Sequence, residues 1–175
     1  MKKFELTNEF ITNMFGTKLF RIRALVEFGD VEAGELGGYV EKESNLGHDD
    51  NAWVYGDARV YDNALVCGNA RVYDNARVYG DAWVYGNARV CGDALVCGDA
   101  RVCGNGDYAY AHGFGSVNRT TTFFRLKDGG VGVRCGCFYG TLAQFRDKIR
   151  ETHGETKKAQ EYLMLADLMK LRFEK

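Results

Sequence analysis

Residues 53–106 read WVYGDARVYDNALVCGNARVYDNARVYGDAWVYGNARVCGDALVCGDARVCGNG, and a six-residue period runs through the whole stretch. Valine recurs at every sixth position from Val54 to Val102, and alanine does so from Ala58 to Ala100. Pairs of Gly, Asp and Asn lie between them, and these residues tolerate the left-handed backbone of tight turns. Each unit therefore predicts a short strand, a corner and a small inward residue.

Three such units would close one triangular coil, so the nine units predict three coils of a parallel β-helix. Residues 18 positions apart are then expected to stack at a strand-to-strand spacing of roughly 4.8 Å. An amphipathic helix is excluded because the period does not fit one and the turn-forming pairs would interrupt it. Antiparallel hairpins are excluded because they need longer runs between turns.

The repeat resembles the hexapeptide-repeat proteins, a family with left-handed parallel β-helices that includes many acyltransferases. The resemblance implies a left-handed coil and a homotrimer. The flanks, including residues 20–25, 36–41, 135–138 and 151–154, also resemble uncharacterised bacteriophage and prophage β-helix proteins. This second resemblance implies a viral or prophage setting and residence in the host cytoplasm.

The N-terminal flank predicts a β cap for a mainly β fold. Within residues 1–52 we expect a strand at 21–26 and an irregular first coil at 31–46. The step from Leu46 to Val54 is eight residues, two more than the repeat allows. This excess predicts a bulging loop between the first coil and the regular coils of 53–106.

The C-terminal flank, residues 107–175, predicts a second cap made of a hairpin and two helices. Asp128-Gly129-Gly130 separates two β-rich runs, and Thr141 to Gln144 matches a capping box. The expected elements are strands at 120–126 and 131–138, a helix between Thr141 and Gly154, and a last helix over 156–173.

Charge and composition exclude several classes of protein. The 23 Lys and Arg residues nearly balance the 24 Asp and Glu residues, so the chain lacks the electrostatic signature of a nucleic-acid or membrane-surface binder. No run of about 18 apolar residues predicts a membrane span. The spacings of the six cysteines fit neither a metal knuckle nor a disulfide scaffold, which favours a reducing cytoplasm.

The coil repeat sorts the outward side chains into three faces. The first face carries Trp53, Arg71, Arg89, Tyr55, Tyr73 and Cys91; the second carries Arg59, Arg77, Leu95, Tyr61, Tyr79 and Cys97; the third carries Leu65, Trp83, Arg101, Cys67, Tyr85 and Cys103. The third face is the most apolar. We therefore expect Leu65, Cys67, Trp83 and Tyr85 to be occluded, either in a homo-oligomer, with a trimer implied by the resemblance, or by C-terminal helices that fold back over them.

The hypothesis that the protein is an acyltransferase depends on its histidines. The resembled acyltransferases use a histidine near a subunit interface as general base. His48 in the bulge and His112 after the last coil are the candidates here, although a surface-loop role is favoured for both. His153 is expected to cap a helix end. With Cys135 and Cys137 it could form part of a zinc site, but free buried cysteines are favoured.

The segment at 113–122 is the best candidate for a ligand site. Its glycines expose backbone N–H groups, its hydroxyl and amide side chains add donors, and its arginine could bind a phosphate or carboxylate bidentately. The candidate ligand-binding residues are Ser116, Asn118, Arg119, Thr121 and Arg134. A glycine-rich connector between coil and cap is an equally acceptable interpretation.

These observations favour a non-catalytic oligomeric scaffold without a cofactor or metal. Its expected partner is a small anionic ligand or a host protein. In a phage setting the ligand could be a nucleotide signal of host defence. The alternative is an acyltransferase that uses a CoA-type donor at a subunit groove.

Overall fold

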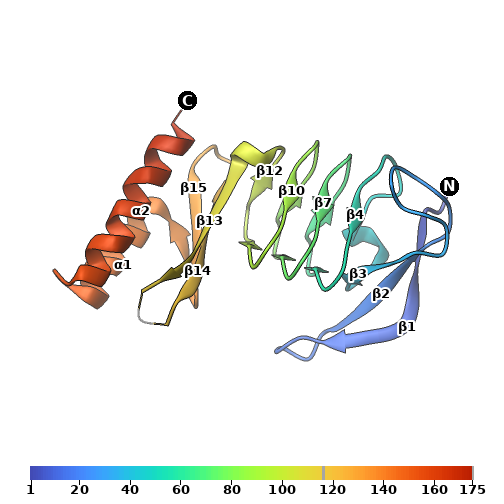
Figure 1. Ribbon diagram of the computed structural model, residues 1–175, viewed down its shortest axis with the longest axis horizontal. Coiled ribbons are helices and arrows are strands. Elements are labelled where there is room, and N and C mark those ends of the chain that lie inside the picture. The colour runs from blue at the N-terminus through green and yellow to red at the C-terminus, as the bar shows by residue number, and fades with distance from the viewer. Residues whose placement is uncertain (116, 175) are drawn as a thin grey trace.

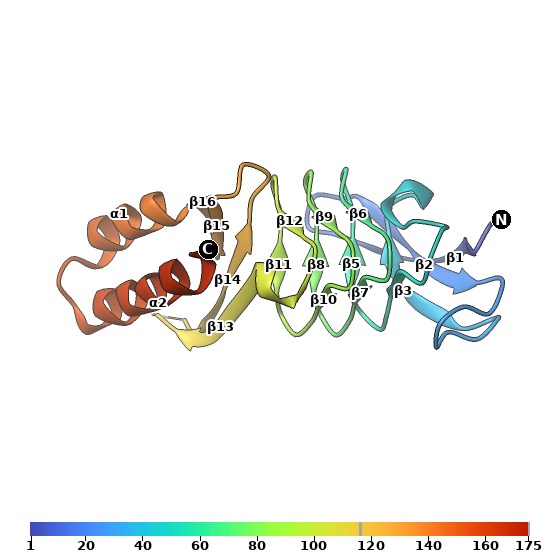
Figure 2. The same ribbon diagram turned by 90° about the horizontal axis from the view of Figure 1, so that it is seen from above.

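The computed structural model describes residues 1–115 and 117–174. An N-terminal group of antiparallel strands, a stack of coils and a C-terminal sheet with two helices follow one another along the long axis (Figure 1). In the orthogonal view the N-terminus lies at one end of the molecule, whereas the C-terminus lies beside the C-terminal sheet, and the loop between the two helices forms the other end (Figure 2).

Two-residue strands recur every six residues through the coil stack. They are β4 (Trp53–Val54), β5 (Arg59–Val60), β6 (Leu65–Val66), β7 (Arg71–Val72), β8 (Arg77–Val78), β9 (Trp83–Val84), β10 (Arg89–Val90), β11 (Leu95–Val96) and β12 (Arg101–Val102). Strands three units apart pair in parallel, so that Val54 lies beside Val72. The repeated valines are fully buried, and the alanines between them are at most 1% exposed. The predicted stacking is therefore confirmed.

The corners of the coils depend on left-handed residues and side-chain ladders. Asp62 and Asp74 have positive φ, and glycine takes the same conformation at most other corners. The amide of Asn51 donates to Asn69 at 3.1 Å, and Asn69 donates to Asn87 at 3.4 Å. Equivalent corners of successive coils are thus linked in register.

The N-terminal cap contains three strands. They are β1 (Phe4–Thr12), β2 (Lys18–Ala24) and β3 (Leu36–Val40), and a short 3₁₀ turn follows at Glu43–Asn45. β1 and β3 flank β2 in antiparallel pairing, and β3 pairs in parallel with β5 of the coil stack. Leu46 bridges to Val66, twenty positions on, so the two extra residues enter between them. The strand expected at 21–26 is β2, displaced by about three residues toward the N-terminus; β1 was not predicted.

The C-terminal cap is a four-stranded antiparallel sheet covered by two helices. After a 3₁₀ turn at Asn105–Asp107, its elements are β13 (Tyr108–Phe114), β14 (Arg119–Arg125), β15 (Val131–Cys135), β16 (Phe138–Thr141), α1 (Leu142–His153) and α2 (Lys157–Phe173). The strands lie in the order β13-β14-β15-β16. The predicted hairpin is β14 and β15, but the sheet has two more strands.

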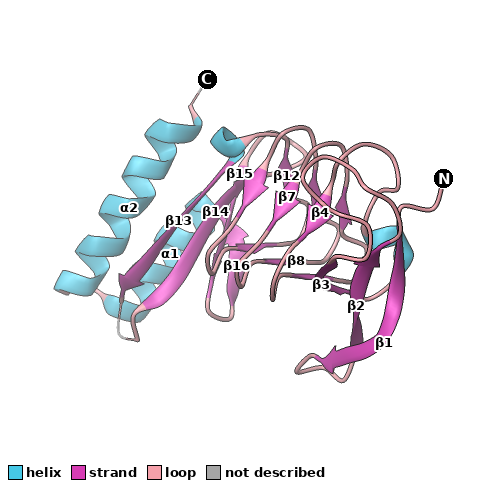
Figure 3. Ribbon diagram, turned by 45° about the vertical axis from the view of Figure 1, so that its right-hand side comes forward, coloured by secondary structure: helices cyan, strands magenta, loops and turns pink. Residues whose placement is uncertain are grey.

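The sheet separates two cores, as the position of its strands between coils and helices indicates (Figure 3). Phe124 points into the core of the coil stack, whereas Phe123 packs with the helices. Alternation along β14 therefore assigns its even-numbered residues to the coils and its odd-numbered residues to the helices.

Both helices begin as the sequence predicts. The backbone N–H of Gln144 donates to Thr141 Oγ1 at 3.2 Å, and the Thr141 N–H donates to Gln144 Oε1 at 2.9 Å, which completes the capping box. The helices pack on the C-terminal sheet, so the alternative in which they fold back over the third face of the coils is wrong. In the described chain, neither helix has the length and apolar character of a membrane span.

Candidate functional site at the junction of coils and cap

A hollow of about 340 Å³ lies where the second face of the coils meets one end of the strands of the C-terminal sheet, and we call it the junction groove. The coils contribute Asn75, Arg77, Asp93 and Leu95 to its lining. The cap contributes Arg119, Thr120 and Gly136. The groove therefore requires both parts of the fold.

Local backbone geometry presents the arginine of the cap. Asn118 has a φ of 49° in the turn before β14, and Arg119 is the first residue of that strand. The guanidinium of Arg119 lies against Gly136, where a Cβ atom would collide with Nη1. Gly136 itself has a φ of 59° in the turn between β15 and β16. Glycine at this position thus permits both the tight turn and the close approach of the guanidinium.

Positive charge dominates the junction groove. Within the described residues neither Arg77 nor Arg119 forms an ion pair with a carboxylate. The carboxylate of the groove, Asp93, accepts a hydrogen bond from the Asn75 amide at 3.3 Å. Two guanidinium groups without ionic partners are suited to bidentate hydrogen bonds with a phosphate or a carboxylate.

Only part of the predicted ligand set reaches the junction groove. Arg119 lines it and Asn118 is exposed in the adjacent turn, while Ser116 lies outside the described residues. Thr121 is fully buried on the helix side of the sheet, where its hydroxyl donates to Cys135 Sγ at 3.2 Å. The hydroxyl at the groove belongs to Thr120, one position earlier.

Arg134, the remaining predicted residue, lies on the coil-facing side of β15. It pairs with Thr122 in the sheet, and its buried Nε has no hydrogen-bond partner among the described atoms. Burial raises the pKa of Tyr79 well above the ordinary value for tyrosine, and the positive charge of Arg134 opposes that shift. Arg134 therefore extends the positive potential of the groove along the second face.

The two candidate catalytic histidines lie far apart in the fold. His48 stacks on Phe4 with ring centroids 4.5 Å apart, and its Nδ1 accepts the backbone N–H of Lys3 at 3.1 Å. These contacts give His48 a structural function in the N-terminal cap. His112 is exposed on β13, within 2.9 Å of the Thr120 hydroxyl.

The cysteines of the cap do not share one side of a strand as expected. Cys135 pairs with Phe138 across a two-residue turn, so Gly136 and Cys137 form the turn between β15 and β16. All six cysteines are free. In residues 1–115 and 117–174, no three His, Cys, Asp or Glu side chains gather as a metal site.

The third face exposes much of its predicted apolar stripe. Leu65 and Trp83 pair in register on β6 and β9, and Trp83 is 45% exposed. The guanidinium of Arg101 lies 4.7 Å from the centroid of the Trp83 ring. Cys67 and Tyr85 are half-buried beside them. The stripe is accessible in the monomer and could be covered by another chain.

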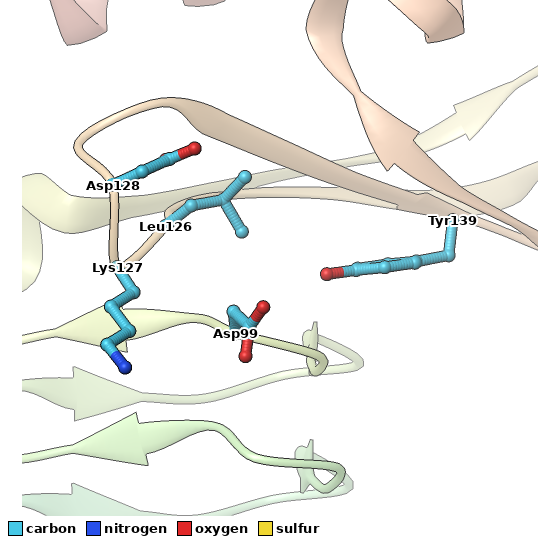
Figure 4. A pocket seen from close by; sticks show the side chains of 5 residues that line it. All are labelled: Asp99, Leu126, Lys127, Asp128 and Tyr139. Atoms are coloured by element: carbon cyan, nitrogen blue, oxygen red, sulfur yellow. The ribbon is translucent and has the colours of Figure 1, made fainter.

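A second hollow of about 370 Å³ also lies between the coils and the C-terminal cap, and its lining has mixed charge (Figure 4). Its lining contains one basic residue, Lys127, and two acidic residues, Asp99 and Asp128, together with Leu126 and Tyr139. Because its acidic residues outnumber its one basic residue, this hollow does not favour an anion. The junction groove is the stronger candidate.

Comparison with known proteins identifies the coil stack alone. A family model described as the YdcK beta solenoid repeat matches residues 52–68, 70–86, 83–98 and 88–104. No curated protein matches the chain. The coil stack is therefore a β-solenoid repeat, in agreement with the resemblance to β-helix repeat proteins.

Proposed function

We propose that the protein is a scaffold that binds a small anion in the junction groove. The observation that carries the proposal is the convergence of Arg77 from the coils and Arg119 from the cap, both without ionic partners in the described chain. Thr120 and Asn75 add neutral hydrogen-bonding groups. A phosphate group, as in a nucleotide, would satisfy both guanidinium groups.

Calorimetric titration with inorganic phosphate and adenosine monophosphate tests this proposal. We expect Arg77→Gln and Arg119→Gln each to weaken binding about tenfold, since each removes a charge-assisted hydrogen bond. Arg59→Gln is the matched control, because Arg59 lies one coil away on the same face and outside the groove. Equal losses in all three variants, or no binding by the parent protein, would contradict the proposal.

We further propose that the solenoid is left-handed and assembles as a homotrimer through the third face. The exposed Trp83, paired in register with the half-buried Leu65, supports this assembly, because apolar stripes of this kind are typical of subunit interfaces. A phage or prophage origin, residence in the host cytoplasm, a host-protein partner and a nucleotide signal of host defence all stay predictions.

One observation favours the alternative of acyl transfer. His112 lies within hydrogen-bonding distance of Thr120, which lines the junction groove. A histidine in that position could accept a proton from an acceptor hydroxyl or amine. Acetyl-CoA should then raise the melting temperature, and His112→Ala should abolish transfer without loss of acetyl-CoA binding. A melting temperature unchanged by acetyl-CoA argues against this alternative.

A further inference from the structure

A separate cavity of about 240 Å³ lies inside the C-terminal cap, on the helix side of the sheet, and we call it the cap cavity. The turn between β15 and β16 forms one wall, and α1 and α2 form the others. The helices contribute most of its lining, whereas the coils contribute most of the lining of the junction groove. Arg119, the first residue of β14, lines both.

The floor of the cap cavity is apolar. Phe145 and Ile149 of α1 are each 3% exposed, and Phe138 packs against Phe145 with ring centroids 5.5 Å apart. Burial raises the pKa of Tyr162 to about 12, so its hydroxyl stays protonated and donates to the Phe114 carbonyl at 3.3 Å. A ring or short chain would therefore contact carbon atoms on several sides.

The rim of the cap cavity is basic. Arg119, Lys148 and His153 line it, and among the described lining residues none is acidic. Lys148 pairs with Glu151 at 3.0 Å, but both side chains are more than half exposed, so this ion pair is weak and can exchange. The imidazole of His153 stacks on Tyr162 with centroids 5.9 Å apart, which holds it at the wall.

From the apolar floor and the basic rim we infer that the cap cavity binds a small carboxylic acid with one apolar ring or a short chain. An engineered apolar cavity of about 150 Å³ is large enough for benzene. The cap cavity has room for such a ring together with a carboxylate directed at the rim. This inference does not depend on an anion in the junction groove, since Arg77 takes no part in it.

The three isoleucines of the chain provide a direct test. Ile149 lines the cap cavity, whereas Ile11 and Ile22 lie in the distant strands β1 and β2. In protein with labelled isoleucine methyl groups, benzoate should shift the Ile149 signal saturably and leave the other two unchanged. Benzyl alcohol, which lacks the charge, should bind at least about tenfold more weakly. Acetate, which lacks the ring, should bind at least about 30-fold more weakly.

Variants separate the cap cavity from the junction groove. Lys148→Gln should weaken benzoate binding about threefold, because an exposed charge is screened. Arg119→Gln should weaken it about tenfold. Arg77→Gln should leave it unchanged while it weakens phosphate binding in the groove. The inference is overturned if benzoate leaves the Ile149 signal unmoved, if benzyl alcohol binds as tightly as benzoate, or if Arg77→Gln matches the effect of Arg119→Gln.

Discussion

Replacement of Val78 by alanine tests the packing of the coil stack. Val78 is fully buried and lies between Val60 and Val96 in the same column. Loss of two methyl groups forfeits about 1.6 kcal/mol at about 0.8 kcal/mol each. A void of about 50 Å³ adds about 1 kcal/mol at about 24 cal/mol per Å³. We expect the free energy of unfolding to fall by about 3 kcal/mol.

Urea denaturation followed by far-ultraviolet circular dichroism, at one fixed protein concentration, measures this loss. Arg89→Ala is the control, because that side chain is exposed on the next coil and its truncation should change stability by less than about 0.5 kcal/mol. The slope of the unfolding free energy against urea concentration should be the same for both variants, since the fold is retained. If Val78→Ala lowers the free energy of unfolding by less than about 1 kcal/mol and leaves the slope against urea concentration unchanged, the inward stacking of the valines is refuted.

Three further predictions concern the third face and the N-terminal cap. Trp83→Glu should convert the assembly to monomers in light scattering, and an unchanged mass would exclude the third face as the interface. Burial lowers the pKa of Lys3 to about 8, against the raising effects of Asp50 and Asp49. Between pH 8 and 10.5 the unfolded chain therefore holds more protons at this residue than the folded chain does, so the free energy of unfolding should rise with pH. The rise should be smaller in Lys3→Met. The same dependence of stability on pH in both proteins would contradict the lowered pKa of Lys3. His48→Ala should cost about 1 to 3 kcal/mol of stability, because it removes the stack on Phe4 and the acceptor for a backbone N–H. The exposed His112→Ala should cost little, and equal losses would contradict the structural function of His48.

The coil stack was predictable because residues at the same position of the repeat have the same surroundings in every coil: valine and alanine point inward, and the turn-forming pairs lie at the corners. Two of the strands that the sequence did not predict, β1 and β13, contain register shifts. β1 is irregular between Leu6 and Phe10, and β13 between Ala111 and Phe114. Such a shift interrupts the alternation on which a strand prediction depends. The expected strand at 131–138 ran through the turn at Gly136 and Cys137, because this pair has glycine alone and lacks the stronger Asn-Gly or Asp-Gly signal of a two-residue hairpin.

The candidate site was less predictable than the fold. Arg119 was identified from its glycine-rich surroundings, but Arg77 was one of several similar arginines in the repeat. Its selection depends on how the cap is rotated about the coil axis, which is a tertiary property. Thr121 was chosen in place of Thr120 because a strand prediction does not fix which alternate side chains face the site, and a shift of one residue reverses the face.

The register between coils and cap has a consequence for changes in chain length. Arg59 and Arg77 occupy equivalent positions of adjacent turns. Removal of a whole turn of 18 residues would keep the orientation of the cap and place Arg59 where Arg77 now lies. Removal of a single six-residue unit would swing the cap round to a different face and separate the two guanidinium groups, even though the inward pattern of Val and Ala would survive. Viable relatives should therefore differ in length by full turns.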